Sequence, residues 1–313
     1  MGITKQSILI TGGYGNLGSW LTHFFCSQGY DVTLLTRKER KLEFEANFNT
    51  IICDISNAED CKDKLQKHYD VIIHTASMND NFVDNYAFDA LKVNALGTRN
   101  ILDAVKEQPP SHFIYFSTFH VYGSYSGKLT EESALTPMND YGTTHLFAEY
   151  YVKQFHKTHN IPFSIIRLSN SYGCPKDYNS SKWYLILNDL SKMAFEKKKI
   201  VLKGNGKGSR DFIWMGDVCD VIHQLSDKKA PNTVFNLSSG VTYSLLDVAN
   251  SVQVAFKEKY GELIPIEINT NDTSTPKNPV EIISDKIKKI IPFEVKSHFK
   301  NEAIEIFNFL EKR

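Results

Sequence analysis

The chain has 313 residues, 42% of them hydrophobic, which predicts an ordered protein with one large α/β domain and a smaller one. Its 36 basic and 36 acidic side chains cancel, so we expect neither nucleic acid nor an anionic membrane as a partner. The five scattered cysteines form no C-x-x-C pair and no membrane-length or signal-peptide pattern stands out, so we expect a cytoplasmic protein with no disulfide framework and no bound metal.

The chain begins with a predicted strand, glycine-rich turn and amphipathic helix within residues 7–27. Gly12, Gly15 and Gly18 form a G-x-x-G-x-x-G pattern across the turn. The first glycine allows a sharp turn, the second lets backbone N–H groups approach a pyrophosphate, and the third lets the helix pack on the strand. We therefore expect a dinucleotide at this turn. Two further residues of the turn are expected to contact it: Asn16 and Leu17.

The end of the second apolar strand, Val32–Leu35, bears on which cofactor binds. A carboxylate there would accept a bond from the 2′-hydroxyl of NAD, whereas a basic residue suits the 2′-phosphate of NADP. The sequence places Thr36 and Arg37 at this point, which favours NADP by charge. The glycine turn adds no second cation to complete a phosphate clamp, so NAD and NADP both remain open.

Two later strands supply further cofactor contacts. The segment 50–56 is predicted to end as a strand at Asp54 and Ile55, where a side chain could meet the adenine. The segment 69–77 reads as an apolar strand buried on both faces of a parallel sheet. Small residues at its carboxyl end leave room for a dinucleotide lying across the strand. These residues are Thr75, Ala76 and Ser77.

A helix is predicted over most of residues 87–106, and Asn94 lies inside it although asparagine is a poor helix former. We expect its amide to bond neighbouring backbone and shape the floor of a site. The next strand, 112–117, ends in Ser117 and Thr118 on the same rim as the glycines. A long helix then begins at Tyr141.

Nine segments occur in the order typical of one family: TGGYGNLG, CDIS, IIHTAS, VNALGTRN, FSTFHVYG, YGTTH, IIRLSNSYGCP, GSRDFIWMGDV and FNLSSGVTYSLLDVA. Together they resemble the extended short-chain dehydrogenases/reductases of the nucleotide-sugar epimerase, dehydratase and ketoreductase group. The resemblance implies a Rossmann-type doubly wound parallel sheet with a smaller α/β substrate-binding domain. It places the dinucleotide domain at 1–170, with a return at about 212–236, and a cap that is mainly 171–313.

The resemblance implies that Tyr141 is the acid/base for a sugar hydroxyl and that Thr118 bonds the same oxygen. In this family a lysine four residues after the tyrosine favours the phenolate and holds the nicotinamide ribose. His145 stands at that position here. A histidine can bond the ribose but carries less positive charge at neutral pH, so it leaves open both an unusual enzyme and a non-catalytic relative.

Other positions bear on the substrate and the reaction. Sugar dehydratases of this group have an Asp–Glu pair after the threonine, whereas this chain has Phe119 and His120, so dehydration lacks an evident acid and base. His120 could instead contact the sugar. The resemblance assigns Asn170 to the sugar or its pyrophosphate and Arg210 to the diphosphate, which a guanidinium binds through paired donors.

The expected function is therefore an NAD(P)-dependent oxidoreductase acting on a nucleoside-diphosphate sugar, with hydride transfer at sugar carbon 4. The preferred prediction is a 4-dehydrogenase or 4-ketoreductase. A 4-epimerase with tightly bound NAD and a non-catalytic dinucleotide-binding protein are the alternatives. The helices at 87–106 and 141–158 pair between subunits in this family, which implies a homodimer.

Overall fold

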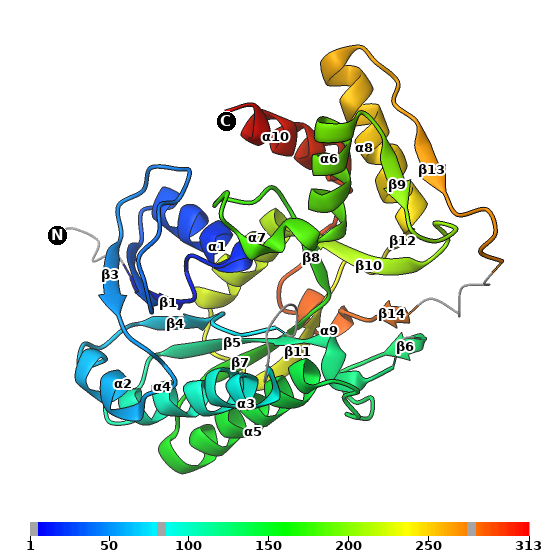
Figure 1. Ribbon diagram of the computed structural model, residues 1–313. Helices are drawn as coiled ribbons and strands as arrows, with labels where there is room; N and C mark the ends of the chain where they lie inside the picture. The colour runs from blue at the N-terminus through cyan, green and yellow to red at the C-terminus, as the bar shows by residue number, and fades with distance from the viewer. Residues whose placement is uncertain (1–5, 80–85, 125, 274–279, 313) are drawn as a thin grey trace.

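The computed structural model describes residues 6–79, 86–124, 126–273 and 280–312. Its centre is a sheet of seven parallel strands in the order β11-β7-β5-β4-β1-β2-β3 (Figure 1). The order reverses direction beside β1, as in a doubly wound sheet, which confirms the predicted fold class. The strands are β1 (Ser7–Thr11), β2 (Asp31–Thr36), β3 (Asn49–Ile52), β4 (Val71–His74), β5 (His112–Thr118), β7 (Phe163–Leu168) and β11 (Thr233–Leu237).

Helices cover both faces of this sheet, which explains why its central strands are apolar on both sides. All seven residues of β5 are buried. Ile114 and Phe116 face the cluster under α1 and α7, whereas Phe113 and Tyr115 face the cluster under α2, α4 and α5. Figure 1 shows these two groups of helices on opposite sides of the sheet. The helices are α1 (Asn16–Ser27), α7 (Met215–Ser226), α2 (Ala58–Lys64), α4 (Gly97–Val105) and α5 (Asp140–His159).

The predicted helix at 87–106 is divided into three pieces. They are α3 (Tyr86–Ala90), a π-helical segment η1 (Leu91–Leu96) and α4. A π-segment widens the helix by about one residue per turn, and such bulges often occur at functional sites. Asn94 lies in this segment with 1% of its surface exposed.

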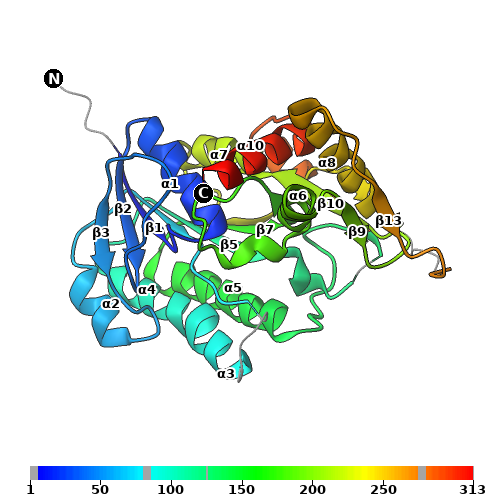
Figure 2. The same ribbon diagram turned by 45° about the horizontal axis from the view of Figure 1, so that its top comes forward.

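A smaller group of elements forms a cap over one end of the sheet (Figure 2). The helices α6, α8 and α10 pack on one another and bury an aromatic core that includes Phe256, Phe299 and Phe307. A capping box between Ser244 and Asp247 begins α8. The cap helices are α6 (Ile186–Lys197), α8 (Leu245–Tyr260) and α10 (Phe299–Glu311), and two short strands accompany them, β9 (Ile200–Leu202) and β13 (Ile266–Ile268).

The cap and the main sheet are joined by a three-stranded sheet of β8 (Asn170–Tyr172), β10 (Ser209–Trp214) and β12 (Thr242–Ser244). After β10 the chain returns to the main sheet through α7 and β11. A short pair, β6 (Gly127–Leu129) with β14 (Val280–Ile282), and the one-turn helix α9 (Asp285–Lys288) complete this side. Among the described residues, the helices are too short or too polar to cross a membrane.

Candidate active site

A cavity of about 280 Å³ opens at the carboxyl ends of the central strands, below the cap. Open α/β sheets bind ligands at this edge, next to the point where the strand order reverses. Twelve of the residues predicted from the sequence line it: Gly12, Gly15, Asn16, Leu17, Gly18, Thr75, Ser77, Ser117, Thr118, Tyr141, His145 and Asn170.

The glycine turn forms one wall of this cavity and has no room for side chains. Gly12 has a φ of +69°, and a Cβ on it would lie 2.9 Å from the backbone of Ala76. A Cβ on Gly18 would lie 2.1 Å from the carbonyl oxygen of Gly12. The turn therefore needs glycine at both positions, for conformation at the first and for close packing of α1 at the second.

The amino terminus of α1 meets the same cavity. Its cap residue, Gly15, makes no side-chain capping bond, and the first turn contains no acidic residue. The side-chain oxygen of Asn16 is buried and has no hydrogen-bond partner within the described residues. A helix start with unpaired backbone donors favours an anion, so these residues suit a pyrophosphate.

Tyr141 and His145 lie one turn apart at the start of α5. Asn139 caps this helix by accepting a bond from Gly142 N at 2.8 Å. The i and i+4 spacing puts both rings on one face, with centroids 4.5 Å apart and planes at 69°. Thr118 lies at the end of β5, and all three side chains line the cavity.

His145 is 2% exposed and lies between the sheet and the cavity. Its Nδ1 is 2.7 Å from the hydroxyl of Tyr115 on β5. Its Nε2 is buried without a hydrogen-bond partner in the described part of the chain. Burial lowers the pKa of His145 to about 4, with Glu149 opposing this shift and His120 adding to it. The ring is therefore neutral at pH 7 and cannot supply the positive charge that a lysine would.

A buried ion pair supports this part of α5. Arg167 on β7 donates to both carboxylate oxygens of Glu149, from Nε at 2.9 Å and from Nη2 at 2.7 Å. Ser117 donates to the same carboxylate at 2.7 Å. The side chains of Glu149 and Arg167 are 0% and 2% exposed. This paired geometry holds α5 against the end of β5, next to Thr118.

Asn94 connects the π-helical segment to the site. Its side chain accepts from Met78 N at 2.6 Å and donates to Met78 O and to the Thr144 hydroxyl, both at 2.9 Å. Thr144 in turn donates to the carbonyl of Tyr141 at 3.2 Å. The predicted backbone contact of Asn94 therefore forms with the loop after β4, and it links that loop to the start of α5.

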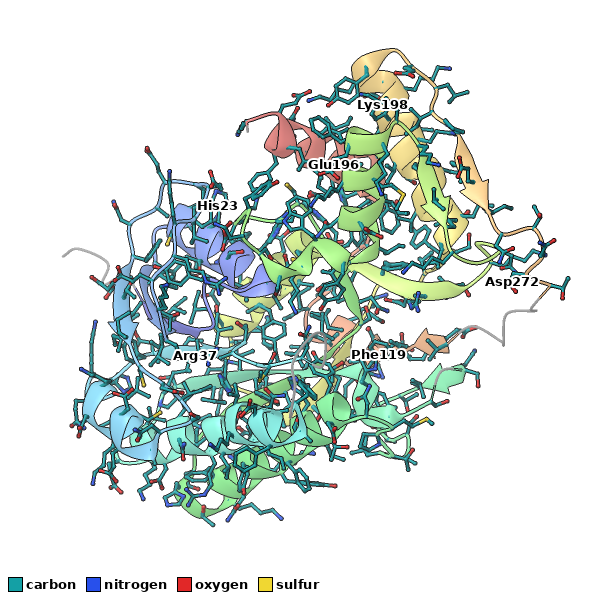
Figure 3. All side chains as sticks on the ribbon, in the orientation of Figure 1. His23, Arg37, Phe119, Glu196, Lys198 and Asp272 are labelled. Atoms are coloured by element: carbon teal, nitrogen blue, oxygen red, sulfur yellow. The ribbon has the colours of Figure 1, made fainter. Side chains whose placement is uncertain are left out.

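Several predicted site residues do not line the cavity: Thr36, Arg37, Asp54, Ile55, Ala76, Asn94, His120 and Arg210. The Asp54 carboxylate accepts bonds from Ser56 within its own turn. Arg210 is exposed on β10, and no carboxylate of the described residues lies within 4.0 Å of it. Figure 3 shows Arg37 on the β2–β3 side of the sheet and Phe119 beneath the cap; neither lines the cavity.

The cap contributes residues that the sequence did not single out. Lys182 and Tyr184 lie on the short helix η3 (Ser181–Tyr184) and line the cavity. Asn79, from the loop after β4, donates to the Tyr184 hydroxyl at 2.6 Å, and Lys182 lies 3.2 Å from that hydroxyl. The other lining residues not predicted are Phe116, Leu168, Ser169, Ser171 and Leu185. The bond from Asn79 to Tyr184 joins the loop after β4 to the cap, and local sequence patterns do not reveal such a long-range contact.

The parallel sheet and its glycine turn define a Rossmann-type dinucleotide fold. Residues 8–238 match the model of the NAD dependent epimerase/dehydratase family, and the chain belongs to this family. This confirms the family and the enzyme class expected from the motifs. NAD, one of the two cofactors left open by the sequence, is the one in the family's description.

Individual relatives agree with this assignment. The dTDP-D-glucose 4,6-dehydratase of Dictyostelium discoideum is 28% identical over 275 residues, which cover 79% of this chain and 61% of that protein. The GDP-6-deoxy-D-talose 4-dehydrogenase of Aggregatibacter actinomycetemcomitans is 29% identical over 249 residues, 78% of each chain. The structure of UDP-glucuronic acid 4-epimerase from Bacillus cereus, in complex with UDP-glucuronic acid and NAD, superposes with a TM-score of 0.78. It is 22% identical and covers 97% of this chain and 99% of its own, which shows a shared fold.

Proposed function

We propose that this protein is an NAD-dependent oxidoreductase that transfers a hydride at carbon 4 of a nucleoside-diphosphate sugar, as a 4-dehydrogenase or 4-ketoreductase. The observation that carries the proposal is the meeting of Thr118, Tyr141 and His145 with the glycine turn around one cavity. The relative named as a sugar-nucleotide 4-dehydrogenase supports this choice of reaction.

The residues of the site fit NAD. Gly12, Gly15 and Gly18 leave room for its pyrophosphate at the start of α1, where Asn16 has an unpaired buried oxygen. His145 Nε2 is available to the nicotinamide ribose. We assign NAD binding to the segment 1–170 and the return at 212–236, and sugar-nucleotide binding mainly to 171–313. Thr36, Arg37, Asp54, Ile55, Thr75, Ala76, Ser77 and Ser117 complete the proposed cofactor path.

When bound, the oxidised cofactor would accept the hydride and the reduced cofactor would donate it, while the side chains handle the proton. Tyr141 exchanges a proton with the reacting sugar oxygen, while Thr118 bonds the same oxygen and fixes its position. His145 is neutral, so it orients the cofactor and Tyr141 without supplying a full positive charge. Activation of the phenol then depends more on the positive charge of the oxidised nicotinamide.

Dehydration is disfavoured by the residues after Thr118. Phe119 is buried, and His120 has its ring centroid 5.7 Å from that of Tyr141. Neither residue offers the carboxylate pair that would protonate a leaving hydroxyl and remove the neighbouring proton. We place His120 beside the sugar, together with Asn170.

Arg210 is the proposed anchor for the diphosphate. It lies on β10, two residues from Phe212, which pairs with Asn170 of β8. Asn170 itself donates to the carbonyl of Asp211 at 2.9 Å, so this part of β10 adjoins a residue of the cavity. Replacing Arg210 by Gln should raise KM for the nucleotide sugar at least about tenfold. Lys207→Gln, also exposed and three residues earlier, is the matched control and should change KM little.

A homodimer is proposed through the helices α3, η1 and α5. These elements pack together, and several large apolar side chains on them face solvent. The exposed fractions are 60% for Phe88, 46% for Phe147 and 52% for Tyr150. A second copy of the chain would cover this surface. Sedimentation equilibrium of the wild type should give a dimer, and Phe88→Lys with Phe147→Lys should give a monomer.

The proposed function is tested by mass spectrometry of the nucleotide that copurifies with the protein, followed by a panel of nucleotide sugars. We expect NAD, and reduced nicotinamide should accumulate with one class of sugar. Conversion to the 4-epimer without a second redox substrate would identify an epimerase instead. Binding of NAD with no reaction across the panel would favour the non-catalytic alternative and contradict the proposal.

A further inference from the structure

Tyr115 is the residue that contacts His145 from the sheet side, and sequence patterns gave it no role. It lies on β5, three residues before Thr118, and is 1% exposed. Its ring lies 5.9 Å from that of His145 and 5.5 Å from that of His74. The hydroxyl reaches the Nδ1 atom of His145 at 2.7 Å.

The hydrogen-bond partners of this hydroxyl decide which nitrogen of His145 carries the proton. Within the described chain, His145 Nδ1 is the only partner of the Tyr115 hydroxyl. A buried phenol O–H left without an acceptor is costly, so the hydroxyl must donate to Nδ1. If Nδ1 carried the proton and donated instead, the phenol hydrogen would have no acceptor. Either tautomer leaves one donor without a protein acceptor among the described residues: the Tyr115 hydroxyl if Nδ1 carries the proton, or His145 Nε2–H if it does not. His145 lines the cavity, where a ligand or water can accept from Nε2, whereas the buried Tyr115 does not line it. The favoured arrangement therefore leaves Nδ1 unprotonated and puts the proton on Nε2.

The hydrogen-bond partners of the neighbouring His74 also fix its tautomer, and here both ring nitrogens have a partner. Thr98 donates to the carbonyl of Asn94 at 2.6 Å, so its oxygen is left to accept from His74 Nε2 at 2.8 Å. Thr11 then donates to His74 Nδ1 at 2.5 Å. His74 is thus a fully paired neutral ring, whereas the Nε2 of His145 has no protein partner among the described residues.

We propose that Tyr115 is a positioning residue that fixes His145 as the neutral tautomer with its proton on Nε2, so that His145 acts as a directed hydrogen-bond donor at the cavity. The family resemblance implies a lysine at position 145, and its ammonium group could donate hydrogen bonds in several directions. The Tyr115–His145 pair instead provides one donor of fixed direction. Its use toward the cofactor ribose rests on the proposed function, but the tautomer itself does not.

The titratable groups around His145 come from four elements. They are Tyr115 on β5, Tyr141 and Glu149 on α5, His120 on the helix η2 (Phe119–Tyr122) and His74 on β4. Glu149 accepts bonds from Arg167 and Ser117, and its carboxylate lies 3.5 Å from Lys153 Nζ. The only one of these groups that bonds Nδ1 directly is Tyr115.

The direct test is nitrogen NMR of the protein labelled at histidine ring nitrogens, at pH 7 and without added ligand. The chain has ten histidines, and loss of one spin system in His145→Gln assigns the signal. We expect Nδ1 of His145 in the unprotonated range and Nε2 in the protonated range. A protonated Nδ1, either as the other tautomer or as an imidazolium, would overturn the proposal. This result does not depend on whether Tyr115 variants fold.

The variant Tyr115→Phe removes only the hydroxyl. We expect the preference for the Nε2-protonated form to be lost and the NAD dissociation constant by calorimetry to rise about tenfold. Tyr30→Phe removes a hydroxyl that lies 2.9 Å from His223 Nε2 outside the cavity, so it is the control and should change neither property. An unchanged tautomer in Tyr115→Phe would also overturn the proposal. Failure of the wild type to bind NAD would instead contradict the proposed function and leave the tautomer result standing.

Discussion

The buried pair of Glu149 and Arg167 gives the sharpest prediction about what holds the site together. Glu149→Gln keeps the shape of the side chain but leaves the guanidinium of Arg167 without its counter-charge. Both side chains are at most 2% exposed, so solvent cannot replace the lost carboxylate. Removing one partner of a buried ion pair costs about 3–5 kcal/mol. For a chain of this size we expect the melting temperature to fall by roughly 5–10 °C.

The assay is urea unfolding followed by tryptophan fluorescence, together with a thermal melt. The matched control is Glu311→Gln, which breaks the ion pair between Glu311 and Lys259. The Glu311 side chain is 42% exposed. Solvent and salt screen an exposed pair, so its loss should change stability little. If Glu149→Gln is no more destabilising than Glu311→Gln, the pair does not support α5 as described. Glutamine can still accept from Ser117 but cannot accept from Arg167 at both atoms, so the loss of stability should exceed any change at Ser117.

Three further outcomes follow from the structure. Gly18→Ala should weaken NAD binding more than tenfold, since its Cβ would lie 2.1 Å from the Gly12 carbonyl and displace the turn; equal affinity by calorimetry would contradict the close packing. Burial lowers the pKa of His145 to about 4 and of His74 to about 3, both from 6.5. As pH falls, the two rings therefore take up protons in the unfolded chain before they do so in the folded protein. The free energy of unfolding is highest above about pH 6.5 and falls toward pH 4 by roughly 1 kcal/mol per pH unit for each ring. Asp217, whose pKa burial raises to about 6, shifts stability in the opposite direction, so the wild type is compared with His145→Gln; urea midpoints that depend equally on pH in both proteins would contradict a neutral buried ring at 145. Asn94→Ala should cost about 1–3 kcal/mol in the free energy of unfolding, because Met78 N loses its acceptor while Met78 O keeps the bond from the Tyr86 hydroxyl; a cost below about 0.5 kcal/mol would show that water replaces the amide.

The sequence predicted the parallel sheet, the glycine turn and most of the cavity lining because these depend on local patterns. Continuous apolar strands such as β5 and glycines at fixed spacing arise from short-range constraints. The spacing from Tyr141 to His145 likewise fixes a shared helix face. These features can be read without knowing which elements come together.

The remaining features depend on contacts between distant segments. Tyr115 reads as one more apolar strand residue, and only the fold brings its hydroxyl to a ring 30 residues later. Glu149 reads as an exposed helix position, yet it is 0% exposed because β7 places Arg167 opposite. The π-helical turn at Asn94 also follows from tertiary bonds to Met78 rather than from helix propensity.

The central claim concerns the proton transfer at Tyr141 beside a bound nicotinamide. Its most direct measurement is the rate at which reduced nicotinamide forms after rapid mixing of NAD-loaded protein with the nucleotide sugar chosen from the panel. Tyr141→Phe should slow this step by at least about 100-fold while NAD affinity changes by less than about twofold. Formation of reduced nicotinamide at the wild-type rate in Tyr141→Phe would show that the phenol does not handle the proton.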